Sequence, residues 1–151
     1  MELREKIFES VKEIFTTMVM MDVTAGGEIP LERIPLMDSI SGIIGLAGTH
    51  KGVLAIHLPH HVAKAITSSF LGMDVDEINS DVEDAVGELA NMLGGNVKSI
   101  LSENGRDINL SMPTTISGKQ YDFQSKKDAE SLVIPCRCDA GEFIIELQLE
   151  K

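Results

Sequence analysis

The sequence is poor in basic residues and has no long apolar run. Lys and Arg number 13 against 24 Asp and Glu, which leaves a formal net charge of −11. Nucleic acids and anionic membranes bind proteins through basic patches, so this balance argues against both as partners. A membrane span needs about 18 consecutive apolar residues, and no stretch approaches that length. Because the N-terminal residues also lack a signal-peptide pattern, we expect a cytoplasmic protein.

Motifs of several familiar enzyme classes are also missing. The sequence has no nucleophile-elbow serine motif, no P-loop and no dinucleotide-binding glycine pattern. Its two cysteines, Cys136 and Cys138, have a spacing at which a disulfide would be strained. They share one face of a predicted strand, and a single Cys-x-Cys pair is half of a metal site at best. We interpret them as small buried side chains in a reducing compartment.

Three histidines, His57, His60 and His61, surround Pro59. Adjacent histidines on a helix point apart, so a metal here would need further ligands that the sequence does not identify. One interpretation makes the chain a metal-dependent hydrolase built on these histidines and the two cysteines, and it predicts bound zinc. No spacing of His and Ser residues singles out a catalytic nucleophile.

What is present is a pattern typical of one globular domain spanning residues 1–151. Hydrophobic residues make up 43% and charged residues 25%, which is ordinary for such a domain. Periods of 3.6 and 2 predict helices over residues 1–20, 59–72 and 80–104, and strands over 39–47, 52–58, 108–113, 131–138 and 142–149. Residues 118–130 are expected to form an exposed loop or hairpin tip. The fold class is therefore α+β, an antiparallel sheet of about five or six strands with three helices packed on it.

The helix predicted over residues 80–104 organises the chain. Ser80 and Glu83 form a capping-box pattern at its start, and Asn104-Gly105 is a stop signal at its end. Its apolar residues recur at helical spacing and form one stripe: Val82, Val86, Leu89, Ala90, Leu93, Val97 and Ile100.

The opposite face of this helix is polar and rich in glycine. Asp84, Glu88 and Asn91 fall within roughly 60° of one another, Gly95 projects in line with them, and Gly87 and Gly94 flank them. Each interior glycine costs about 1 kcal/mol relative to alanine, so three of them need an explanation. Either they relieve crowding against another element of the fold, or they form a smooth surface that a partner's backbone approaches.

A family resemblance rests on this helix and the strand that follows it. Asp84, Glu88 and Asn91, with Pro113 twenty-two positions beyond the asparagine, resemble the signature of the CheC/CheX/FliY phosphatases. The strings DAVGELANMLGGNV and INLSMPTTISG are most similar to the CheX branch. The helix HHVAKAITSSFLG contains no Glu-x-x-Asn, so the resemblance implies a single site.

The resemblance implies an activity and a set of roles. CheX-like proteins dephosphorylate the aspartyl phosphate of CheY-type response regulators in bacterial chemotaxis. Asn91 would position the attacking water, and Glu88 would pair with a receiver lysine. The partner surface would comprise Asp84, Gly87, Gly94, Gly95 and Lys98, and Pro113 would be structural. No cofactor of its own is implied, because Mg²⁺ is held by the receiver. The resemblance also implies a homodimer in which the sheets of two subunits associate.

A rival interpretation assigns the same surface a binding role without catalysis. The same helix could bind a receiver domain or a flagellar-switch component as a non-catalytic adaptor. The presence of both Glu88 and Asn91 argues against a pure binder, since binding alone needs no water-positioning amide.

Overall fold

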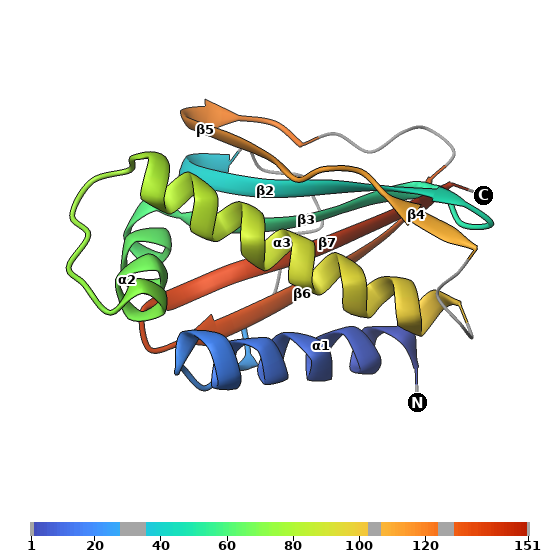
Figure 1. Cartoon of the computed structure of the whole chain (residues 1–151), viewed down its shortest axis with the longest axis horizontal. Helices are drawn as coiled ribbons and strands as arrows, with labels where there is room; N and C mark the ends of the chain where they lie inside the picture. Colours follow the sequence, from blue (N-terminus) through green and yellow to red (C-terminus); the bar gives the residue numbers. More distant parts are fainter. Residues whose placement is uncertain (1, 28–35, 103–106, 124–128, 151) are drawn as a thin grey trace.

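A layer of helices covers one face of an antiparallel sheet in the computed structural model of the chain (Figure 1), which describes residues 2–27, 36–102, 107–123 and 129–150. The helices are α1 (Leu3–Ile14), a π-helical turn η1 (Phe15–Val19), α2 (His60–Leu71) and α3 (Ser80–Leu101). The strands are β1 (Thr24–Ala25), β2 (Leu36–Gly48), β3 (Gly52–Pro59), β4 (Ile108–Leu110), β5 (Thr114–Tyr121), β6 (Ala129–Cys138) and β7 (Gly141–Glu150).

The sheet is open and antiparallel throughout its described strands. Its order is β1-β6-β7-β3-β2-β4, and β5 pairs with the same side of β2 as β4 does. The predicted α+β class with three helices is confirmed, and two strands that were not predicted, β1 and β5, raise the number of strands to seven. The strands predicted over residues 131–138 and 142–149 form the hairpin β6–β7, and those predicted over residues 39–47 and 52–58 form the hairpin β2–β3.

The core lies between α3 and the sheet. Figure 1 shows α3 crossing the sheet diagonally, with α1 beside it and α2 at one end. The even-numbered residues of β2 face this helix, as shown by the contacts of Gly42 with Val86 and of Ile44 with Gly94. The predicted apolar stripe of α3 is buried except for the half-buried Ile100: Val82, Val86, Leu89, Ala90, Leu93 and Val97.

The outer edge of the sheet differs from the sequence prediction. The strand expected over residues 108–113 stops at Leu110, and a second strand begins at Thr114. Leu46 pairs with Leu110 whereas Ile43 pairs with Thr114, so three steps along β2 match four steps along the edge. The extra residue forms a β-bulge at Met112-Pro113. A proline lacks the N–H that a ladder requires, which explains why the alternation in the sequence did not continue as one strand.

Two other boundaries also differ. The loop expected over residues 118–130 is shorter, because residues 118–121 belong to β5 and residues 129–130 to β6. The helix expected over residues 1–20 is α-helical only to Ile14 and ends in the π-helical turn, where Met20 adopts a left-handed conformation with φ of 63°.

Candidate functional site

The ends of α3 are fixed by side chains. At the start, the Asn79 side-chain oxygen accepts a hydrogen bond of 3.2 Å from the Val82 backbone N–H. Asn79 is therefore the N-cap, and the predicted capping box at Ser80 and Glu83 is wrong by one residue. Both Asn and Ser are good capping residues, so sequence preference alone did not distinguish these neighbours. The predicted stop at Asn104-Gly105 lies outside the described residues.

The C-terminal end of α3 is tied to the β2–β3 turn through Asp107. The Ser102 hydroxyl donates to one carboxylate oxygen of Asp107, and the Thr49 hydroxyl donates to the other at 2.9 Å. These two hydrogen bonds, the one from Ser102 first, lower the pKa of Asp107 below its usual value. The helix is thus held at both ends, which fixes the position of its exposed face.

That exposed face presents the polar residues predicted from the sequence. Asp84, Glu88 and Asn91 are all exposed on α3. A β-carbon added to Gly95 would have no heavy atom of the described residues within 4 Å, so the helix surface beyond Asn91 is open in this part of the structure. The carboxylates of Asp84 and Glu88 and the carboxamide of Asn91 therefore lie beside a flat patch of backbone at Gly95. Lys98, which is half-buried, lies on the same face of α3 about one turn beyond Gly95.

The other two glycines face neighbouring elements of the domain. Gly94 is buried, and a β-carbon there would lie 3.2 Å from two carbons of Ile44 on β2. Gly87 is also buried, and its β-carbon would lie 3.9 Å from the Pro113 ring. The crowding interpretation therefore applies at Gly94, whereas Gly95 has the open surroundings that the partner-contact interpretation requires.

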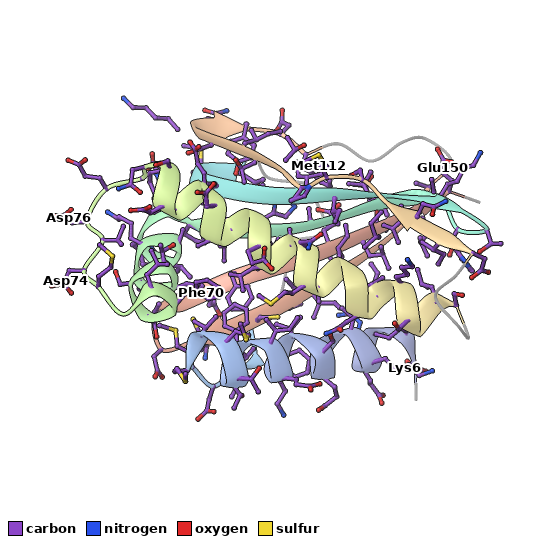
Figure 2. The ribbon with its side chains drawn as sticks, in the orientation of Figure 1. Lys6, Phe70, Asp74, Asp76, Met112 and Glu150 are labelled. Atoms are coloured by element: carbon purple, nitrogen blue, oxygen red, sulfur yellow. The ribbon has the colours of Figure 1, made fainter. Side chains whose placement is uncertain are left out.

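The bulged edge of the sheet forms the wall beside this face. Gly87 meets Pro113, and the β-carbon position of Gly94 lies 3.6 Å from Leu110. Asn91 is about one turn from each of these glycines along the helix and on the same side, so it lies on the side of α3 that is nearer the bulge. Met112, at the junction of β4 and β5, is an exposed large apolar side chain at the bulge (Figure 2). This exposure was not predicted, because a methionine in an alternating strand is expected to face the core.

The histidines and cysteines do not assemble into a common site. His57 lies on the sheet face away from the helices, with its Nδ1 2.6 Å from the Ser41 hydroxyl and its Nε2 3.2 Å from a Glu146 oxygen. His60 instead contacts the Ser117 hydroxyl on β5 at 3.0 Å. Among the described residues, no three His, Cys, Asp or Glu side chains are grouped so that they could hold a metal ion.

Both cysteines are buried free thiols, in line with the interpretation from sequence. Burial, together with the neighbouring Cys138, raises the pKa of the Cys136 thiol to about 12. A thiol with so high a pKa is a poor nucleophile and a poor metal ligand at neutral pH.

The described helices also bear on the membrane question. None of them combines the length and the apolar character that a transmembrane helix needs.

The fold and the exposed face together define a CheC-like class of α+β protein. The crystal structure of a CheC-like superfamily protein from Shewanella sp. PV-4 superposes with a TM-score of 0.85 at 28% identity, covering 99% of this chain and 97% of that one. The family model described as "Chemotaxis phosphatase CheX" matches residues 40–137, and the chain belongs to this family.

Two further relatives are informative about the family. The CheY-P phosphatase CheX of Thermotoga maritima is 25% identical over 120 residues, which cover 79% of this chain and 75% of that protein. The CheX of the CheX–CheY–BeF3–Mg²⁺ complex from Borrelia burgdorferi has a TM-score of 0.79 at 20% identity, with 99% of each chain covered. At that identity the likeness shows the shared fold.

Proposed function

We propose that this chain is a phosphatase that hydrolyses the aspartyl phosphate of a CheY-type response regulator. The main support is the exposed pair Glu88 and Asn91, one turn apart on a helix that is fixed at both ends. Membership of the CheX family and the activity in the name of the Thermotoga relative point the same way.

Hydrolysis of an aspartyl phosphate requires few catalytic groups from the phosphatase itself. Phosphoryl transfer passes through a loose transition state, so positioning a water in line with the scissile P–O bond is the main task. The water oxygen bonds to phosphorus, the bond to the aspartate oxygen breaks, and inorganic phosphate and a free carboxylate result. The Asn91 carboxamide has a hydrogen-bond acceptor and a donor on a short side chain, which suits holding that water.

The remaining polar residues would orient the partner. Glu88 lies about one turn before Asn91 and would pair with a cationic group of the receiver, which the resemblance identifies as a lysine. Asp84 and Lys98 extend this contact along α3, and Gly95 leaves room for the partner's backbone. We assign Mg²⁺ to the receiver's own carboxylates, where it neutralises the phosphoryl group, and no cofactor to this chain. The presence of Mg²⁺ together with CheY in the Borrelia complex supports this assignment.

We further propose a cytoplasmic homodimer that leaves α3 exposed. β1 has two residues whereas its neighbour β6 has ten, so within the described chain most of the outer edge of β6 is not paired by a strand. An open edge of this kind favours association. Light scattering should give about twice the 16.4 kDa mass of one chain, and a clean monomer would contradict this assembly.

The decisive test separates binding from turnover. Asn91→Ala should slow dephosphorylation of saturating phosphorylated receiver by a large factor while the dissociation constant for a beryllofluoride-loaded receiver is nearly unchanged. Glu88→Ala should weaken that binding and also reduce turnover. Normal turnover by Asn91→Ala would refute the mechanism. Tight binding by the wild type without accelerated dephosphorylation would instead identify a non-catalytic adaptor.

A further inference from the structure

Met112 is an apolar side chain in an unusual position. It is 86% exposed, more than any other large hydrophobic residue in the described part of the chain. An exposed methionine on a mobile tail would need no explanation, but this one lies within the sheet edge, between β4 and β5 (Figure 2).

The backbone on both sides of Met112 is held in place. The Ser111 N–H donates to the Gly45 carbonyl at 2.9 Å, and the Gly45 N–H donates to the Ser111 hydroxyl oxygen at 2.8 Å. The same hydroxyl donates to the Met112 carbonyl at 3.0 Å. On the other side, the ring of Pro113 restricts φ. The position of Met112 is therefore set before any partner binds, and only its side chain is free to adapt.

Met112 also belongs to the segment of the sheet edge that runs along the Asn91 side of α3. The neighbours of the bulge, Leu110 and Pro113, face Gly94 and Gly87 on α3, and Asn91 lies between these two glycines on the helix. A partner that brings a phosphoryl group to Asn91 therefore also covers Met112. A second copy of this chain seated on Met112 would instead block Asn91.

We propose that Met112 is the apolar docking residue for the phosphorylated receiver, inserting into a hydrophobic depression next to the receiver's phosphorylated aspartate. This inference rests on the proposed function. The polar groups of α3 give orientation and chemistry, while interfaces gain much of their affinity from a few buried apolar side chains, among which methionine is enriched. The unbranched, polarisable side chain of methionine can adapt to an irregular pocket.

The test is a titration of each variant with a CheY-type receiver loaded with beryllofluoride and Mg²⁺. Met112→Ser should weaken binding about tenfold or more, because burying a methionine side chain changes an equilibrium constant by one to two orders of magnitude. Its turnover at saturating phosphorylated receiver should stay within about twofold of the wild type. Met112→Leu, which keeps the apolar volume, should bind within about threefold of the wild type.

Ile116→Ser is the matched control, because Ile116 is 45% exposed on β5 and pairs with Ser41 on the face away from the helices. It should leave binding within about twofold. Unchanged binding by Met112→Ser, with turnover still lost in Asn91→Ala, would overturn the docking role and leave the proposed function intact. Conversion of a dimer to a monomer by Met112→Ser would overturn it as well. A wild type that neither binds the loaded receiver nor dephosphorylates it would overturn both proposals.

Discussion

Gly42 on β2 lies against the backbone of Val86 on α3. A β-carbon at Gly42 would lie 2.9 Å from the Val86 carbonyl oxygen and 2.9 Å from its Cγ1, closer than real contacts of this kind. The absence of a side chain at Gly42 therefore sets the distance between helix and sheet. Because Val86 is two residues before Glu88, the same contact sets the height of the exposed face above the sheet.

Gly42→Ala should destabilise the domain. The methyl group must displace backbone of α3, and overpacking of this kind costs about 1–3 kcal/mol in the free energy of unfolding. Urea unfolding measures the change. Gly95→Ala is the matched control, because no atom of the described part of the chain lies within 4 Å of its β-carbon position and removing a helical glycine stabilises by about 0.5–1 kcal/mol. Equal stability of Gly42→Ala and wild type would show that α3 is free to move away from β2.

Gly95→Leu should weaken binding of the beryllofluoride-loaded receiver while the protein remains folded. A leucine would project from a surface that is open in the free protein and would hold the partner's backbone away. Gly95→Ala adds much less volume and should bind more nearly as the wild type does. Binding unchanged in Gly95→Leu would remove Gly95 from the partner surface.

Asn79→Ala should cost about 1 kcal/mol of stability, because it removes the acceptor for the Val82 N–H at the start of α3. Ser80→Ala should be close to neutral, since Ser80 lies inside the helix and makes no cap. Thermal unfolding of the two variants side by side distinguishes them, and the reverse order of stabilities would restore the capping box at Ser80 and Glu83.

Asp107 should make the stability depend on pH in the acid range. Its pKa in the folded protein lies below the ordinary value of 3.8, chiefly because Ser102 and Thr49 donate hydrogen bonds to the carboxylate. The stabilisation is therefore complete well above pH 3.8 and is lost as the pH falls through the folded-state pKa. Urea unfolding between pH 6 and about 3 should show a shallower decline for Asp107→Asn than for wild type. Thr49→Val should lie between them, and a slope that neither substitution changes would contradict this role.

Much of the fold could be predicted because the spacing of apolar residues in the sequence reflects which side chains are buried. The apolar stripe of α3 is set by which side chains face the core, and the apolar runs of β3, β6 and β7 reflect burial in the sheet, so the bounds of these strands agree with prediction within about two residues. The bulge could not be predicted, because it depends on Gly45 and Ser111, which are distant in sequence and meet only when β2 and the edge pair. The π-helical turn after Ile14 depends on tertiary contacts in the same way; one is the hydrogen bond from the Ser69 hydroxyl to the Val19 carbonyl.

The candidate site was likewise predicted only in part. Spacing alone placed Asp84, Glu88 and Asn91 on one exposed face, because helix geometry is regular. It could not separate Gly94 from Gly95, which are adjacent in sequence. Their surroundings differ because Ile44 packs against the β-carbon position of Gly94, whereas within the described ranges no heavy atom lies within 4 Å of that of Gly95. Chemistry came only from the family resemblance, since an exposed carboxamide has no distinctive sequence pattern of its own.

The bulge at Met112-Pro113 also determines which face of the sheet each side chain of β5 points to. β4 and β5 pair with the same strand one residue out of step, and side chains on a strand alternate between two faces. Deleting a single residue here would join the two strands in one register and turn every side chain beyond it to the opposite face. Thr115 would leave Gly87, and Tyr121 would lose its hydrogen bond of 2.8 Å to Ser41. Insertions and deletions in this segment should therefore be tolerated in pairs and not singly, so the length of the bulge is constrained as strictly as the residues that form it.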